Sequence, residues 1–188
     1  GMKKILQYSL TTAFDVTAAT LEKETAQIQQ QQYEPQDVKF NSDGTVIFIL
    51  GQGSAGKFGE PRLGINRWSL STPYDIGSIV VADDTFTEIG GLPRGLAFNN
   101  DGTKMFVINQ TNRLLTEYNL STPYDPDTKT ATNTLTNYTT GGQYHQGLGF
   151  NADGTKMFVV KGKAAITGNV IDEYALSTAF DISSSSAT

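Results

Sequence analysis

The sequence has no cysteine, which excludes disulfide bonds, cysteine nucleophiles and thiolate metal sites. It also has no apolar run close to the roughly 20 residues that a membrane-spanning helix needs, so we expect no membrane partner. Lys and Arg number 14 against 19 Asp and Glu, for a formal net charge of -5 without a basic patch. Phosphate backbones are bound by such patches, and we therefore expect no nucleic-acid partner. Nothing in the composition points to a cofactor.

Two motifs recur along the chain. Phe-Asn-x-Asp-Gly-Thr occurs three times, at 40–45, 98–103 and 150–155, and its aspartates are 58 and 52 residues apart. Leu-Ser/Thr-Thr-Ala/Pro-Phe/Tyr-Asp occurs four times, at 10–15, 70–75, 120–125 and 176–181. A period of roughly 50 residues indicates a repeat protein. The additional copy of the second motif indicates that the chain begins inside a repeat.

Each repeat has the pattern of β-strands. Alternating β-branched and aromatic residues at 46–50, 105–108 and 157–160 predict buried strands, and Asp-Gly before each predicts a hairpin with a preceding strand. A third strand follows, with one inward aromatic and one inward leucine per copy, as in Glu117–Leu120. A weaker fourth strand has the polarity of an outer edge. Residues 21–32 contain helix-forming residues but hold the fourth-strand position, so we predict a strand there.

Four antiparallel strands per unit are typical of a β-propeller blade. We predict one all-β domain over residues 1–188, a β-propeller-type array of about three and a half blades. It would comprise a partial blade at 3–32 and full repeats at 33–90, 91–142 and 143–188. Propellers close with about four to eight blades, so either more chain or another copy must complete this one. We favour a homo-oligomer, most simply a twofold dimer, because open blade faces would expose apolar surface.

The signature Phe-Asn-x-Asp-Gly-Thr-Lys-Met-Phe-Val, at 98–107 and 150–159, resembles repeats of the YVTN/lactonase-like propeller superfamily. It is most similar to the Asp-Gly-Thr-Lys-Met repeats of uncharacterised bacterial, marine and phage-associated proteins. This resemblance covers almost the whole chain and implies blade architecture, in a secreted, cell-surface or phage-associated setting. It says little about activity, because propellers host hydrolases, lyases, lectin-like binders and scaffolds on one frame.

The resemblance also places two sets of loops around one mouth of a central channel. One set lies before each first strand, and the other lies between the second and third strands, at 51–64, 109–113 and 161–169. Alignment of the repeats puts Gln36, Arg94 and Gln146 at one equivalent position, with Tyr144 and His145 beside the last of them. Long polar side chains around a channel mouth could hydrogen-bond a sugar or another small polar ligand. The plainer interpretation is that they fill or hydrate the channel entrance.

His145 is the single histidine and replaces Pro35 and Pro93 of the other units. An imidazole could act as a base or ligand near neutral pH, but no carboxylate lies beside it in the sequence to orient it. We therefore predict a non-enzymatic binding or structural module, with a carbohydrate or protein as ligand. The alternative is a lactonase-like or other hydrolase with its site at the channel mouth.

Other candidate sites have structural explanations. Residues 51–57 have the glycines and lysine of a phosphate loop but lack its Ser/Thr continuation, so an insertion between strands is predicted. Trp68 stands where tyrosines occur in other copies and is expected in the core. The repeated aspartates are expected to cap turns or to form hairpins rather than to bind a metal; they are Asp15, Asp75, Asp125 and Asp181 in one motif and Asp43, Asp101 and Asp153 in the other.

Overall fold

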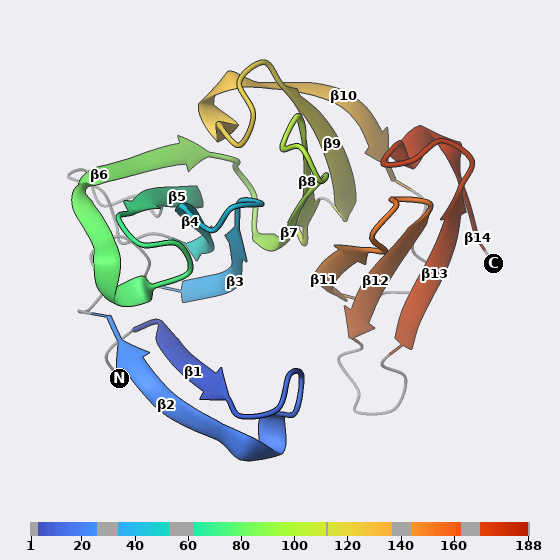
Figure 1. Ribbon diagram of the computed structural model, residues 1–188. Helices are drawn as coiled ribbons and strands as arrows, with labels where there is room; N and C mark the ends of the chain where they lie inside the picture. Colours follow the sequence, from blue (N-terminus) through green and yellow to red (C-terminus); the bar gives the residue numbers. More distant parts are fainter. Residues whose placement is uncertain are drawn as a thin grey trace.

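The chain forms an open arc of small antiparallel sheets. The computed structural model describes residues 4–25, 34–52, 62–111, 113–136, 144–162 and 170–187. Within these residues there are one two-stranded and three four-stranded sheets, arranged around a common centre (Figure 1). The predicted fold class is confirmed: this is a β-propeller array of about three and a half blades. None of the helices in the described ranges is long and apolar enough to cross a bilayer.

We name the sheets blades A to D in chain order. Blade A contains β1 (Leu6–Leu10) and β2 (Ala19–Glu24). Blade B contains β3 (Glu34–Phe40), β4 (Val46–Gln52), β5 (Leu63–Leu70) and β6 (Ile79–Glu88). Blade C contains β7 (Pro93–Phe98), β8 (Lys104–Asn109), β9 (Leu114–Leu120) and β10 (Lys129–Leu135). Blade D contains β11 (Tyr144–Phe150), β12 (Lys156–Gly162), β13 (Val170–Leu176) and β14 (Ser185–Ala187).

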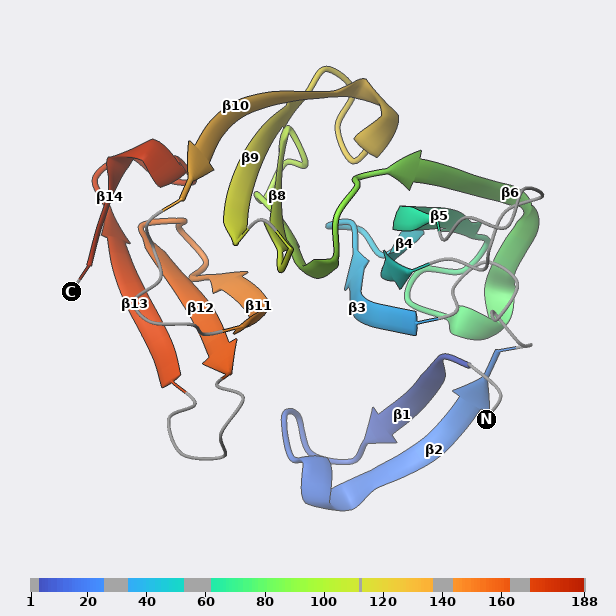
Figure 2. The same ribbon diagram turned by 180° about the vertical axis from the view of Figure 1, so that it is seen from behind.

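The strands of each full blade are hydrogen-bonded in chain order, so the first strands lie nearest the centre and the fourth strands form the outer edge (Figures 1 and 2). The predicted outer position of the fourth strand is therefore confirmed. Residues 21–24 of the segment 21–32 belong to strand β2, as predicted, and residues 26–32 lie outside the described ranges. Blades A and D are the two ends of the arc, and an opening separates them (Figure 2).

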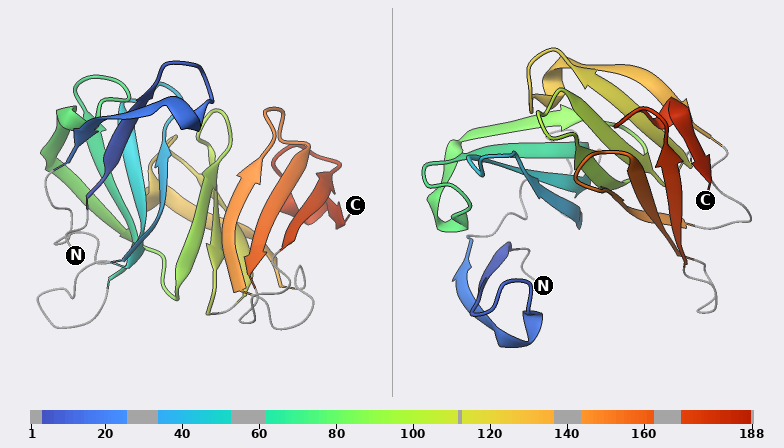
Figure 3. Two further views of the ribbon diagram at one scale, coloured as in Figure 1. Left: turned by 90° about the horizontal axis from the view of Figure 1, so that it is seen from below. Right: turned by 45° about the vertical axis from the view of Figure 1, so that its right-hand side comes forward.

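The two repeated motifs form turns along the same edge of the molecule (Figure 3). The hairpin glycines Gly44, Gly102 and Gly154 have φ of +73°, +72° and +71°, as the Asp-Gly prediction requires. Each aspartate of the second motif caps a short 3-10 turn by accepting a hydrogen bond from the amide two residues later. Both predictions from the motifs are confirmed.

An aromatic ring from the second motif covers the hairpin glycine of its own blade. A Cβ added to Gly102 would lie 2.2 Å from Cδ2 of Tyr124, and one added to Gly154 would lie 2.2 Å from Cδ2 of Phe180. These aromatic residues have a positive φ, which is uncommon for a bulky side chain. The contact between ring and glycine therefore holds the two turns of a blade together and constrains both positions.

The hydrophobic core lies between blades rather than within them. We call the face of a blade toward the next blade in the chain its forward face, and the opposite face its rear face. The forward face of blade C and the rear face of blade D share one buried cluster, with Phe106, Ile108 and Leu115 on one side and Met157, Val159, Leu176 and Ile182 on the other. Trp68 is buried in the cluster at the rear face of blade B, as predicted for a core aromatic.

Blade A does not follow the predicted burial. Its third-strand residues Tyr8 and Leu10 are 50% and 39% exposed, whereas their counterparts Trp68 and Leu70 are 3% and 5% exposed. The prediction that these side chains point into the core is therefore wrong for this blade. The reason is physical: burial of a blade face requires a second blade against it, and the rear face of blade A has no neighbour within the described residues.

Candidate functional site

The residues aligned at the channel mouth occupy a β-bulge at the start of each first strand. The register between first and second strand shifts between Pro35 and Asp37 in blade B, between Pro93 and Gly95 in blade C, and between His145 and Gly147 in blade D. The extra residues at these shifts are Gln36, Arg94 and Gln146. The sequence alignment therefore identified one structural position in three blades.

These segments are strands, so their prediction as loops is wrong. Proline and polar residues favoured loops in the sequence, but proline is tolerated at the first residue of a strand and beside a bulge. A bulge also re-aims the side chain of its extra residue. Tyr144 begins β11 opposite Gly162, and its side chain is outside the part of the chain that the structure describes.

A chain of hydrogen bonds connects two of the bulges. Arg94 donates from Nη1 to Oε1 of Gln36 and from Nε to Oε1 of Gln110, both at 2.6 Å. Asp37, next to the first bulge, accepts from the backbone amide of Leu96 at 2.9 Å and from Nζ of Lys39 at 2.9 Å. The inner strands of blades B and C are thus joined by side chains at this end of the channel.

A groove of about 440 Å³ opens between the inner strands of blades B and D. Gln36, Asp37 and Lys39 line it from blade B, and Gln146 lines it from blade D. Its other wall is apolar and includes Phe158 and Val160 of β12. Residues far apart in the sequence therefore face one groove with a polar side and an apolar side. Sequence reasoning missed Asp37, Lys39 and the apolar wall, although the polar residues on either side of Val38 are a signal for the first two. Gln110 lies in the segment 109–113 that is expected at the channel mouth.

His145 lies inside blade D. Its side chain is fully buried, and burial together with the nearby charges of Lys161 and Arg113 lowers its pKa from 6.5 to about 4. The imidazole is therefore neutral at pH 7. Lys161 is buried as well, burial lowers its pKa, and it forms an ion pair with Asp172. Because the ring does not reach solvent, His145 is not part of the groove surface in this structure.

A second hollow, of about 460 Å³, lies at the hairpin end of the inner strands. Its asparagines are engaged in turns: the side-chain oxygens of Asn99 and Asn151 accept hydrogen bonds from the amides of Lys104 and Lys156. In the described ranges, no three His, Asp or Glu side chains converge as metal ligands. Of the glycine-rich segment 51–57, residues 53–57 lie outside those ranges.

Comparison with known proteins supports the fold. No family model and no curated protein matches the chain. A crystal structure of a protein from Lactobacillus plantarum is similar with a TM-score of 0.54 and 16% identity, over 91% of this chain and 47% of that one. A candidate 6-phosphogluconolactonase from Bacteroides fragilis has a TM-score of 0.54 and 14% identity, over 98% of this chain and 47% of that one. A functionally unknown protein from Desulfotomaculum acetoxidans has a TM-score of 0.51 and 12% identity, over 98% and 61%.

The Lactobacillus and Bacteroides structures are β-propellers, so the propeller part of the predicted resemblance is confirmed. At identities this low the similarity shows the fold alone. The chain spans about half the length of the Lactobacillus and Bacteroides proteins. Its assignment to the family of Asp-Gly-Thr-Lys-Met repeats stays a prediction.

Proposed function

We propose that the chain is a non-enzymatic binding module whose groove between blades B and D takes a small hydroxyl-rich ligand of the saccharide class. The observation that carries this proposal is the convergence of Gln36 and Gln146, from equivalent bulges of two blades, on one groove with an apolar wall. Amide side chains offer both donors and acceptors, which suits the hydroxyl groups of a sugar. Phe158 and Val160 offer a surface for its C–H face.

The hydrogen-bonded groups around the groove also support a binding role. Arg94, which also donates to Gln110, fixes the amide of Gln36, and the ion pair with Lys39 fixes Asp37. A polar site whose side chains are already held in place loses less conformational entropy when a ligand binds. The groove volume of about 440 Å³ lies within the range of roughly 300–1,000 Å³ typical of small-molecule sites.

The hydrolase alternative has support from fold similarity to candidate lactonases, and fold does not carry activity. A mechanism with His145 as base needs a ring that reaches the substrate, and this ring is fully buried. The groove does contain the carboxylate of Asp37, but its two oxygens already accept hydrogen bonds from Leu96, Val38 and Lys39. The binding role therefore has the stronger geometric support.

A glycan array followed by titration calorimetry tests the proposal. We expect at least one saccharide to bind, and we expect Gln146→Ala and Gln36→Ala each to weaken binding about tenfold, the effect of losing hydrogen bonds worth about 1.4 kcal/mol. Asn119→Ala is the matched control, because Asn119 is an exposed amide in β9 that does not line the groove. Its affinity should equal that of the unmodified chain.

Two results would overturn the proposal. One is a glycan array on which no saccharide binds, with calorimetry confirming the absence of binding. The other is a saccharide affinity that Gln36→Ala and Gln146→Ala leave unchanged. Hydrolysis of a sugar lactone by the purified chain, abolished by Asp37→Asn, would establish the enzymatic alternative instead.

A further inference from the structure

The two ends of the arc expose faces that are buried in the interior blades. On the forward face of blade D, Val160 is 41% and Ile171 is 68% exposed, while their counterparts Ile108 and Leu115 on blade C are both 0% exposed. On the rear side of blade A, Val16 is 76% exposed, while its counterpart Ile182 on blade D is 0% exposed. The apolar residues exposed at both ends of the arc therefore occupy positions that a neighbouring blade covers in the interior blades.

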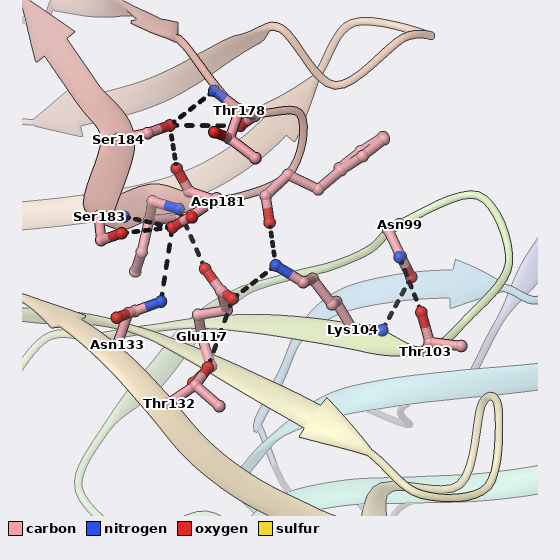
Figure 4. A network of polar contacts seen from close by, with 12 residues as sticks. Asn99, Thr103, Lys104, Glu117, Thr132, Asn133, Thr178, Asp181, Ser183 and Ser184 are labelled. Carbon is pink, nitrogen blue, oxygen red and sulfur yellow. Dashed lines mark hydrogen bonds and ion pairs between the residues drawn. The ribbon is translucent and has the colours of Figure 1, made fainter.

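The junction between blades C and D shows what covers such a face. Glu117 of blade C is almost fully buried and accepts from the backbone amide of Ile182 at 3.0 Å, in the capped turn of blade D (Figure 4). Lys104 pairs with Glu117 at 2.8 Å and also donates to the carbonyl oxygen of Phe180 at 2.8 Å (Figure 4). Together they hold the Phe180–Ile182 turn. We call such a lysine and glutamate pair a turn socket.

Blade D carries a second turn socket of the same kind. Lys156 and Glu173 are the repeat counterparts of Lys104 and Glu117, and their side chains pair at 2.6 Å. The pair is preformed, but its side chains are 50% and 38% exposed, against 26% and 2% for the pair on blade C. The other two junctions use different groups: Gln7 of blade A accepts from the amide of Ile76, and Arg67 of blade B pairs with Asp125.

Blade A carries the turn that matches this socket. Its sequence Ala13-Phe14-Asp15-Val16 corresponds to Ala179-Phe180-Asp181-Ile182, the turn held by the lysine and glutamate of blade C. Blades B and C have Pro-Tyr-Asp instead, and their turns meet Gln7 and Arg67. Asp15 already caps this turn through a hydrogen bond from the amide of Thr17 at 2.9 Å. The turn is therefore folded, and Phe14 is 97% exposed.

We infer that the forward face of blade D binds the capped turn of blade A from a second copy of this chain. Lys156 would donate to the carbonyl oxygen of Phe14, Glu173 would accept from the amide of Val16, and the Val16 side chain would cover Ile171. Two copies related by a twofold axis make this contact twice and close on each other. The interface has the chemistry of the junction between blades C and D, which the chain already forms internally.

The contact covers the outer half of the forward face. The described part of blade A contains third and fourth strands, and in blade D the turn after the third strand is what meets the socket of blade C. Phe158 and Val160 of β12 stay beside the groove. Ile171, which the contact covers, also lines the groove, so the two sites share this residue. The association is measured without any saccharide, so failure of one proposal is distinguishable from failure of the other.

Light scattering across a concentration series measures the association directly. We expect a species of twice the chain mass, and we expect Glu173→Lys to raise its dissociation constant about tenfold or more, because a cation would replace the acceptor for Val16. Glu88→Lys is the matched control: it makes the same charge change at an exposed position in the outermost strand of blade B. It should leave the dimer intact.

Single-cysteine chains distinguish a second copy from closure within one chain. The 188-residue chain has no cysteine, so Val16→Cys and Ile171→Cys chains can be mixed and oxidised without background. We expect a mixed disulfide between the two, and little product from either alone or from Val16→Cys mixed with Val38→Cys. Any of three results would overturn the inference. The first is a monomer at every concentration, and the second is a dimer that Glu173→Lys leaves unchanged. The third is cross-linking of Val38→Cys to Val16→Cys with a yield equal to that of Ile171→Cys.

Discussion

The closed junction between blades C and D and the open ends of the arc are made from the same sequence motifs, yet their environments differ. Lys104 and Glu117 hold a turn and are shielded by it, while Lys156 and Glu173 form the same pair in solvent. The ring of Phe180 covers Gly154, whereas Phe14 of blade A is 97% exposed. A repeat therefore supplies compatible surfaces, and the neighbouring blade supplies the burial that stabilises them.

The largest difference in stability between equivalent substitutions should appear at the apolar residues of the covered and the open blade face. Leu115→Ala removes a fully buried side chain and should lower the free energy of unfolding by about 2–5 kcal/mol. Ile171→Ala, at the counterpart position, should change it by less than about 0.5 kcal/mol in the monomer. Urea denaturation at low protein concentration measures both. Equal losses would show that blade D is covered in solution.

The two lysine–glutamate pairs should also differ in their contribution to stability, with the buried pair of blade C contributing more than the exposed pair of blade D. Glu117→Ala leaves the ammonium of Lys104 and the amide of Ile182 without their buried acceptor and should cost about 3 kcal/mol. Glu173→Ala removes a half-exposed partner and should cost less than about 1 kcal/mol in the monomer. The same denaturation experiment measures both variants. An equal loss in the free energy of unfolding for Glu173→Ala and Glu117→Ala would contradict the prediction.

Blade D also differs from blades B and C at His145, and this predicts a pH dependence. The pKa is about 4 in the folded chain against 6.5 for the ordinary group, so the unfolded chain binds more protons between these values. The free energy of unfolding should therefore fall as pH decreases from 6.5 to 4, by at most about 3 kcal/mol. His145→Pro, which introduces the residue of the other two blades, should flatten this slope. A slope unchanged in that variant would contradict the prediction.

The smallest change in stability is expected at the aromatic residues with positive φ. Its sign should be opposite at the two equivalent positions Phe14 and Phe180. Phe14→Gly relieves backbone strain at φ +63° without losing a packed ring, and it should stabilise the monomer by less than about 1 kcal/mol. Phe180→Gly relieves similar strain but removes the ring that covers Gly154 and packs on Phe150, so it should destabilise by about 2 kcal/mol. Thermal unfolding of both variants checks the signs.

Much of the blade could be predicted because the relevant interactions are local. The Asp-Gly hairpins, the capping aspartates and the alternating strands each follow from a few neighbouring residues, and so does the equivalence of Gln36, Arg94 and Gln146. The candidate site was harder to predict. The apolar wall of the groove comes from β12, and the burial of His145 depends on how its surroundings in blade D pack.

The sequence by itself determined the repeat, its phase and the strand order, because hydrogen bonds and alternation within one unit are encoded over short distances. Only the tertiary structure decided which copies of a motif are buried. Tyr8 and Trp68 occupy the same place in their repeats, but one is half exposed and the other lies in the core. The physical reason is that the hydrophobic contribution depends on area removed from water, and in a propeller that area is removed by the next blade.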